Sequence, residues 1–260
     1  KRISVRLDEL LFTQGFGTRR VCAGLIQQGL VSMQGLPCDD PATECPVEDP
    51  AFNFTVQGQR WPYRRLAYLM LHKPAGTECS QRPGAWPSIY TLLPAPLRQR
   101  PAPGKTQGVQ AVGRLDQDTT GLLLLSDDGA FIHRMNSPRH HVPKVYEVTT
   151  RHPVEARQIE QLLSGVVLMD DPQPVRAAAC EAVAEHRLLL TLTEGKYHQV
   201  KRMVAAVGNR VEALHRSRIG GLALPADLAP GQWCWLDAEQ LARLQGKQAT
   251  ALPPAGNQRI

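Results

Sequence analysis

The sequence predicts an α+β protein in which a small N-terminal α/β module precedes a larger domain built on a largely antiparallel, mixed sheet. Two observations favour this fold class. Residues 7–33 have the pattern of two short helices followed by a strand. Residues 67–236 have the pattern of many short strands with only a few helices between them, and such strands pair mostly with antiparallel neighbours.

A change in composition separates the two parts. Pro, Gly and Arg interrupt any periodicity at residues 57–66. We therefore expect a linker there, with a first domain at residues 1–62 and a second domain at residues 63–245. Residues 246–260 are rich in Gly, Pro, Ala and Gln, and this composition predicts a disordered tail.

The N-terminal module is expected to contain one helix from about Leu7 and a second helix over residues 19–28, with Thr18 as the N-cap of the second. A strand over residues 30–33 follows. The residues predicted to form the buried stripe of the second helix are Val21, Leu25 and Ile26.

Two basic residues, Arg19 and Arg20, open this second helix. Positive charge at a helix N-terminus opposes the helix dipole, and a bound phosphate would supply the missing negative charge. The alternative is a helical cap without a ligand. Acidic residues that cluster at positions 39–49 weaken a purely electrostatic argument.

Hydrophobic periodicity in the second domain gives its predicted elements. Strands are expected at residues 67–71, 109–112, 122–125, 144–150, 166–169, 175–183, 187–193, 211–214 and 233–236. Helices are expected at residues 128–135, 154–163, 197–207 and 237–244. Residues 215–218 are interpreted as a basic loop. Several prolines in residues 80–108 exclude long regular structure and predict a mobile loop, which either contacts the ligand of the protein or is a disordered insertion.

The net charge of the 260-residue chain, +6, comes from two segments. Residues 133–151 hold four Lys or Arg against one Glu, a net +3, and residues 194–218 hold six against two Glu, a net +4. The rest of the chain therefore sums to −1. Such clustering is what a phosphate-binding surface requires, although two solvated faces would give the same count.

Cysteine usage and hydropathy indicate the compartment. The six cysteines form no C-x-x-C pair and none has zinc-finger spacing to a histidine, so we expect reduced thiols. No apolar run approaches the roughly 18 residues of a membrane span, and the N-terminal residues lack the apolar core of a signal peptide. We therefore expect a cytoplasmic protein without membrane contact.

The chain is organised around residues 112–128, with the sequence V-G-R-L-D-Q-D-T-T-G-L-L-L-L-S-D-D. Asp116 lies in a polar turn between two apolar strands, where a reactive carboxylate would be held rigidly. The simpler alternative is an ordinary surface turn. Asp116 and Asp118 could also suggest a metal site, but no further cluster of Asp, Glu or His completes one, so we expect no metal.

The pattern G-R-L-D-x-x-T-x-G-L-L resembles the catalytic loop of the pseudouridine synthases that carry an N-terminal S4 RNA-binding module (the RsuA type). The helix pair followed by G-L-V-S-M-Q-G is similar to the S4 fold, and K-P-A-G at residues 73–76 matches the first strand and turn of the catalytic domain. The segments S-P-R-H-H, K-Y-H-Q-V-K-R-M-V-A-A-V-G-N and R-I-G-G-L-A-L-P-A-D-L-A-P-G look most like the 16S branch. The resemblance extends from about Val5 to Leu241.

The resemblance implies roles for several residues. Asp116 would be the catalytic carboxylate, acting without metal or cofactor. Tyr146 would stack on the uracil and help remove the C5 proton, although a half-buried strand aromatic is the structural alternative. Lys201, in H-Q-V-K, would keep Asp116 ionised, and Arg202 is the open alternative for that role. Arg114 would fill the space that the flipped uridine leaves.

Other basic residues are expected to bind the substrate. They are His198, Arg139, Lys144, Arg19 and Arg20, with His140, His141, Arg216 and Arg218 as further candidates. Individually, each of these could equally be surface charge.

The resemblance implies a site-specific enzyme that isomerises a uridine of 16S ribosomal RNA to pseudouridine by base flipping and attack of Asp116. The expected partner is ribosomal RNA, either free or in a ribosome assembly intermediate, and the protein is expected to be a monomer. Three alternatives stay open: a 23S enzyme of the same family, a ribosome-associated RNA-binding protein without catalysis, and a metal-dependent nuclease or hydrolase.

Overall fold

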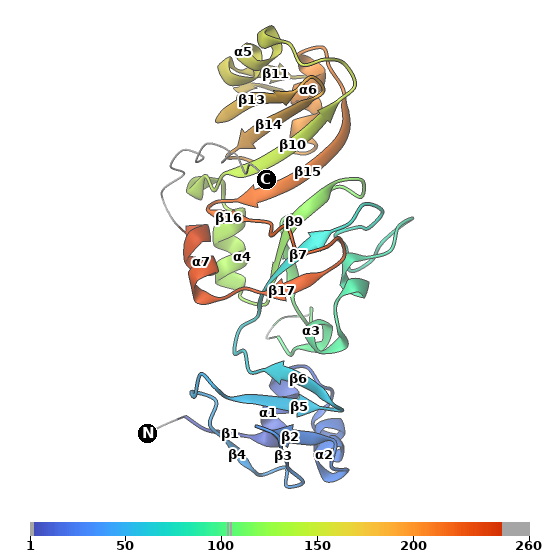
Figure 1. The fold of residues 1–260 in the computed structure, drawn as a ribbon, viewed down its shortest axis with the longest axis vertical. Coiled ribbons are helices and arrows are strands. Elements are labelled where there is room, and N and C mark those ends of the chain that lie inside the picture. Colours follow the sequence, from blue (N-terminus) through green and yellow to red (C-terminus); the bar gives the residue numbers. More distant parts are fainter. Residues whose placement is uncertain (1–2, 103, 105, 246–260) are drawn as a thin grey trace, which may run out of the picture.

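The computed structural model describes residues 3–102, 104 and 106–245 and has two domains, stacked along the long axis in Figure 1. The predicted α+β fold, with an N-terminal module and a mostly antiparallel sheet, is confirmed. The predicted tail at residues 246–260 lies outside the described residues. None of the described helices has the length and apolar character needed to cross a membrane.

The N-terminal domain combines two short helices with short strands. Its elements are β1 (Val5–Arg6), α1 (Leu7–Thr13), α2 (Arg19–Gln27), β2 (Val31–Met33), β3 (Leu36–Pro37), β4 (Glu44–Cys45), β5 (Asn53–Val56) and β6 (Gln59–Pro62). Four strands pair in the order β3-β2-β5-β6, and β1 pairs with β4. The side chain of Thr18 accepts a hydrogen bond from the amide of Val21, as its predicted role as N-cap requires.

Two predictions for this domain were wrong. Val21 is 50% exposed, because helix α2 turns Cys22 and Ile26, which are one helical turn apart, into the core instead. The predicted linker begins too early, because residues 59–62 form β6 and pair with β5 in a hairpin. The tight turn between them, at residues 57–58, has the positive φ angles of such a hairpin.

The second domain is built on a nine-stranded sheet. Its strands are β7 (Tyr68–Lys73), β8 (Gln110–Val112), β9 (Thr120–Ser126), β10 (Lys144–Thr150), β13 (Ala179–Ala184), β14 (Arg187–Leu192), β15 (Val211–Ile219), β16 (Leu222–Ala223) and β17 (Trp233–Trp235). The order is β13-β14-β10-β15-β9-β7-β17, with β16 paired to β15 and β8 paired to β9. Strands β11 (Val166–Leu168) and β12 (Asp171–Val175) form a separate hairpin.

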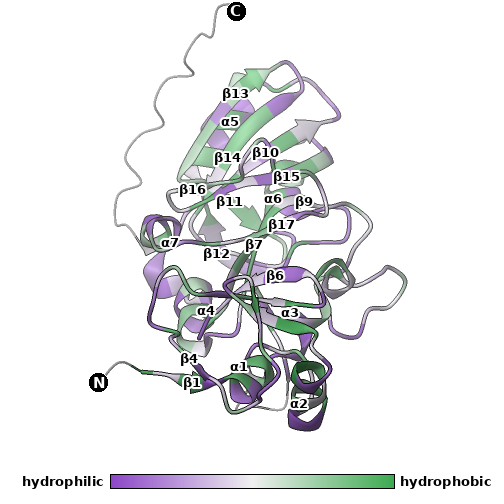
Figure 2. Cartoon of the chain, turned by 60° about the horizontal axis from the view of Figure 1, so that its bottom comes forward, coloured by the Kyte–Doolittle hydropathy of each residue, from purple (hydrophilic) through white to green (hydrophobic). Residues whose placement is uncertain are grey.

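Helices lie around this sheet (Figure 1). They are η1 (Ile89–Leu92), α3 (Ala95–Gln99), α4 (Gly129–Asn136), η2 (Pro138–His140), α5 (Ala156–Ser164), α6 (Gln199–Ala206) and α7 (Ala238–Gln245). Helix α6 buries Val200, Met203 and Val204, as the i, i+3, i+4 spacing predicts. Figure 2 shows hydrophobic colour on central strands such as β7 and hydrophilic colour on the outer helix α7.

The four-leucine run forms the middle of β9, and its side chains are buried on both faces, as predicted. Strand β9 pairs antiparallel with β7 and β8, and parallel with β15. The parallel pairing is close at Gly121, where φ is +115° and an added Cβ would lie 2.2 Å from the carbonyl oxygen of Arg216. Only glycine fits there, so Gly121 joins the two halves of the sheet directly behind the predicted catalytic turn.

Two irregular segments differ from their predictions. Residues 80–108 do not form a mobile loop in their described part, because Ile89, Tyr90, Leu93 and Leu97 are buried in the core. Their prolines limit η1 and α3 to single turns but do not prevent packing. Residues 215–218 are not a loop, because β15 continues through them to Ile219. Pairing with neighbours on both sides outweighs the charged composition.

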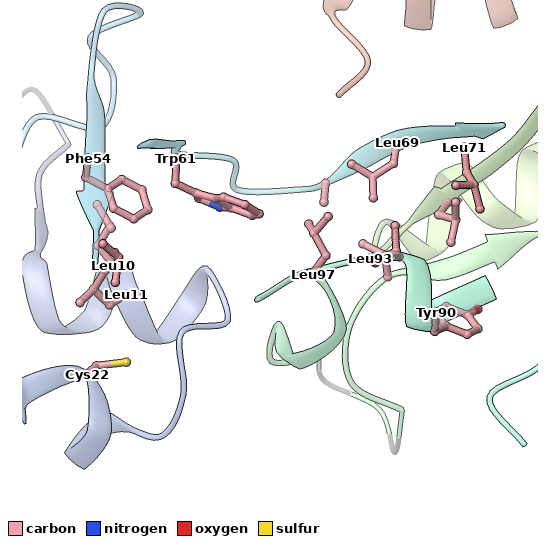
Figure 3. Packing of buried hydrophobic residues seen from close by; sticks show 14 of the residues in the cluster. Leu10, Leu11, Cys22, Phe54, Trp61, Leu69, Leu71, Tyr90, Leu93 and Leu97 are labelled. Atoms are coloured by element: carbon pink, nitrogen blue, oxygen red, sulfur yellow. The ribbon is translucent and has the colours of Figure 1, made fainter. Parts of the chain in front are cut away.

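The two domains share one continuous hydrophobic core. Trp61 of β6 packs against Phe16 of its own domain and against Trp233 and Trp235 of β17. Figure 3 shows Trp61 between Phe54 of the first domain and Leu97 of the second. The N-terminal domain is therefore docked on the sheet rather than only tethered to it.

A buried ion pair completes this junction. Arg100 Nε donates to Asp127 Oδ2 at 2.7 Å, and the two side chains are only 2% and 9% exposed. The other guanidinium nitrogens donate to Gln14 Oε1 and to the carbonyls of Arg64 and Arg65. This one side chain thus connects the first domain, the link at residues 63–67 and the start of α4.

Candidate active site

The buried side chain of Lys73 fixes the turn between β8 and β9. This lysine is fully buried at the end of β7, and its Nζ donates hydrogen bonds to the carbonyls of Pro74, Gln117 and Thr119 at 3.1, 3.2 and 2.8 Å. Burial lowers its pKa from the ordinary lysine value. The amide of Gly76 also donates to the carbonyl of Gln117 at 2.8 Å. The backbone around Asp116 is therefore fixed by neighbouring β7.

Both carboxylate oxygens of Asp116 face basic side chains from the start of α6. His198 Nε2 lies 3.1 Å from Oδ1, and Lys201 Nζ lies 3.2 Å from Oδ2. The Asp116 side chain is one-third exposed (33%), so it is partly desolvated but reachable. One carboxylate oxygen thus lies against the ammonium group of Lys201 and the other against the imidazole of His198.

The neighbouring carboxylate, Asp118, shares the same lysine. Lys201 Nζ donates to its two oxygens at 2.9 and 3.1 Å, although Asp118 is 57% exposed. This hydrogen bond lowers the pKa of Asp118 against the opposing effect of burial. For Lys201, burial lowers the pKa, but the hydrogen bonds to Asp118 and Asp116 outweigh it, so the pKa is raised. Lys201 therefore stays charged throughout the neutral range.

These residues lie around a cavity beside the turn. The predicted site residues that line it are Arg114, Asp116, Tyr146, His198 and Lys201. Tyr146 reaches it from β10, where it stands opposite Leu190 of β14 and Arg216 of β15. Arg114 is exposed at the entrance side of the turn. Residues up to 87 positions apart in the chain, Arg114 and Lys201, thus meet at one concave site.

Within the described residues, no group of three or more His, Cys, Asp or Glu side chains is arranged to hold a metal ion. The cavity offers two partly buried carboxylates, Asp116 and Glu194, together with Lys201 paired to Asp116, the ring of Tyr146 and the exposed Arg114. This arrangement suits nucleophilic or acid/base chemistry on a planar, uncharged group.

Comparison with known proteins gives the family. The RNA pseudouridylate synthase family matches residues 67–206, more than half of the chain. This chain belongs to that family. The S4 domain family matches residues 5–50, within the N-terminal domain.

The chain is also similar to individual family members over most of its length. It is 40% identical over 240 residues to ribosomal small subunit pseudouridine synthase A of Escherichia coli (strain K12), covering 92% of this chain and 99% of that protein. It is 38% identical over 239 residues to the Pasteurella multocida protein of the same name, covering 92% and 98%. A crystal structure of a pseudouridylate synthase aligns with a TM-score of 0.63 at 34% identity, covering 93% of this chain and all of that one.

In this family member, several predicted substrate-binding residues lie away from the cavity lining. Arg202, the alternative partner of Asp116, instead forms an ion pair with Asp170 and donates to the carbonyl of Tyr197, so the contact with Asp116 is made by Lys201. Lys144 lies on β10, where burial and nearby Arg216 lower its pKa. The residues exposed elsewhere on the surface are Arg139 on η2, and Arg19 and Arg20 on α2.

Arg216, a further candidate for contact with the substrate and otherwise expected to be surface charge, is neither exposed nor free. It is buried in β15, and its Nε donates to the carbonyl of Leu122 at 2.9 Å. Its strand runs between β10 and β9, and the side chain is buried on this part of the sheet.

Two contributions to the site were missed from the sequence. His198 was expected to bind substrate, yet the structure places it against Asp116, because a φ of +47° at the start of α6 turns it toward the loop. The support from Lys73 was also missed. The K-P-A-G pattern marked its position but gave no sign that the lysine is buried under the turn.

Proposed function

We propose that this protein converts one uridine of 16S ribosomal RNA to pseudouridine, with Asp116 as the reacting carboxylate. The observation that carries the proposal is the geometry of Asp116, whose two oxygens face His198 and Lys201 at the wall of a cavity that also contains Tyr146. The names of the relatives, which refer to the small ribosomal subunit, support the choice of RNA.

The proposed reaction leaves the composition of the nucleotide unchanged. The bond between C1′ and N1 breaks, the uracil turns, and a new bond forms between C1′ and C5. The proton on C5 is lost and N1 gains one. Asp116 must be ionised to act as nucleophile or base, and the adjacent Lys201 favours that state. Tyr146 stacks on the uracil and is placed to assist removal of the C5 proton.

A uridine inside stacked RNA cannot reach this cavity, so the nucleotide has to be flipped out. Arg114 is two residues from Asp116 and exposed, and its planar guanidinium can stack in the vacated space. The need for access favours naked RNA or an assembly intermediate over the finished ribosome. Because one chain supplies all the named groups, we further infer that it acts as a monomer in the cytoplasm, where ribosomes are assembled.

The test is pseudouridine mapping of ribosomal RNA from cells that make the normal protein, Asp116→Asn or Asp118→Asn. Asparagine keeps the shape of each side chain, and Asp118→Asn is the matched control because it shares Lys201. We expect Asp116→Asn alone to remove one 16S pseudouridine.

Other maps would change the conclusion. Loss of a 23S pseudouridine would retain the chemistry and replace the substrate. A map that Asp116→Asn leaves unchanged, with folded protein at normal abundance, would favour an RNA-binding protein without catalysis.

A further inference from the structure

The side chain of Tyr197 has no role in the site described above. It is 77% exposed, the second-highest exposure among the large hydrophobic side chains of the described residues. One face of its ring stacks on the imidazole of His198, with 3.8 Å between centroids and 19° between planes. Such a parallel stack leaves the opposite face open to solvent.

The ring lies at the rim of the cavity rather than in it. Lys196 and His198, on either side of Tyr197, line the cavity, whereas Tyr197 does not. His198 in turn lies 3.1 Å from Asp116. A planar group on the open face of Tyr197 would therefore be separated from the reacting carboxylate by two stacked rings. This place suits a neighbour of the target nucleotide, because the target itself must enter the cavity.

The backbone that carries the ring is held in place from both sides. Arg202 Nη1 donates to the carbonyl of Tyr197 at 2.9 Å, and the same guanidinium is ion-paired with Asp170. The amide of Lys196 donates to Gln199 Oε1 at 2.8 Å, and Lys196 Nζ is paired with Asp171. An exposed ring on a fixed backbone loses little freedom when it binds, which favours recognition.

An open aromatic face at the rim of the cavity suits an unpaired RNA base, because bases that are splayed out of a helix stack on aromatic side chains. Three cations, Lys196, Lys201 and Arg202, lie within five residues of Tyr197, and each is paired with a carboxylate of this chain. The contact expected at Tyr197 is therefore stacking on its ring rather than attraction of phosphate to free cations. A protein partner is the alternative that the experiment below tests.

We propose that Tyr197 is the stacking platform for an unpaired RNA base next to the target uridine. The inference rests on the proposed function, because it takes a flipped-out nucleotide in the cavity as its reference point. The flanking base, Tyr197 and His198 then form one stack that ends at Asp116. The neighbouring base would thus contact Tyr197, which stacks on His198, and His198 lies against the carboxylate of Asp116.

The experiment compares Tyr197→Leu with Tyr197→Phe on small-subunit ribosomal RNA transcribed in vitro. Leucine keeps apolar bulk without a ring, whereas phenylalanine keeps the ring without the hydroxyl. Pseudouridine formation gives kcat and KM, and filter binding in an Asp116→Asn background gives Kd without turnover. We expect Tyr197→Leu to raise KM and Kd about 5- to 150-fold, the range for one stacked base. For Tyr197→Phe we expect about twofold or less.

Several results would overturn the platform. One is an unchanged Kd for Tyr197→Leu, and another is an equal loss for Tyr197→Phe, which would mean a hydroxyl contact. A defect seen on assembly intermediates but not on naked RNA would mean a protein partner instead. If the normal protein forms pseudouridine neither on this RNA nor on assembly intermediates, the proposed function fails, and the Kd comparison still decides whether Tyr197 stacks on RNA.

Discussion

Helices α6 and α2 both carry basic residues in their first turn, but these residues contact different groups. At α6, Lys201 turns inward and contacts Asp116 and Asp118. At α2, Arg19 pairs with Glu9 and lies over the ring of Phe12, while Arg20 is exposed. The sequences alone look alike, because both oppose the helix dipole. Each helix thus meets a carboxylate from another segment, and the difference lies in the surroundings: Lys201 and Asp116 line a cavity together with Tyr146, whereas Arg19 and Glu9 form an exposed surface pair.

The largest effect is expected for Lys201→Met, in helix α6. Methionine preserves the length of the side chain but removes the positive charge that lies 3.2 Å from Asp116 Oδ2. We expect the single-turnover rate to fall about 100-fold or more. Lys201→Arg should retain part of the rate. The control is Arg210→Met, an exposed cation just beyond α6. An equal loss in Arg210→Met, or none in Lys201→Met, would mean that the inward cation has no special role.

The next effect concerns the buried side chain of Arg100 at the junction between the two domains. Arg100→Met leaves Asp127 buried without its partner, which costs about 3–5 kcal/mol in comparable pairs. We expect a matching loss in the free energy of unfolding, measured with urea. Arg98→Met is the control, because Arg98 lies in the same short helix α3 but is exposed. If Arg100→Met unfolds no more easily than Arg98→Met, the side chain of Arg100 does not stabilise the junction between the domains.

A smaller effect is expected for the two arginines at the start of helix α2. If α2 contacts RNA phosphates, Arg20→Gln should weaken binding and reduce the slope of log K against log salt by about 1. Arg19→Gln should do less, because Arg19 must first release Glu9. Filter binding across a salt series measures both slopes. Identical slopes in the normal protein and Arg20→Gln would show that α2 does not contact phosphate.

The smallest effect is a pH dependence. The pKa of Asp118 is lowered in the folded protein, so its pairing with Lys201 stabilises the fold above the unfolded carboxyl pKa. That contribution is lost as pH falls through the folded pKa. Because Asp118 is mostly exposed, we expect only a slight shift, measurable as a difference in urea midpoint between normal protein and Asp118→Asn. The difference should shrink as pH falls below about 4, the ordinary pKa of an aspartate, toward the lower pKa of the folded state. A difference that grows as pH falls would contradict this assignment.

Local patterns predicted much of the fold. Strand β10 and the leucine run of β9 have the predicted positions, and α6 has its predicted buried face, because each follows from a period of two or 3.6 residues. The extension of β15 through residues 215–218 was missed, because only pairing with β9 and β10 makes that charged segment a strand. The packing of residues 80–108 was missed for the same reason: it depends on distant partners.

The site, too, could be predicted only in part from the sequence. The resemblance selected Asp116, Tyr146 and Lys201, and the structure brings all three to one cavity. Their roles in catalysis stay predictions. The choice between Lys201 and Arg202 could not be made from the sequence, because adjacent residues on a helix point about 100° apart and either could face the turn. The distance from Asp116 decides it.

The most direct test of the central claim is the single-turnover rate of pseudouridine formation by purified Asp116→Asn and Asp118→Asn on small-subunit ribosomal RNA, with Kd measured on the same RNA. The account predicts a loss of more than about 1000-fold for Asp116→Asn with little change in Kd, and at most about tenfold for Asp118→Asn. Comparable rates for the two variants, with both folded and bound to RNA, would show that Asp116 is not the reacting carboxylate.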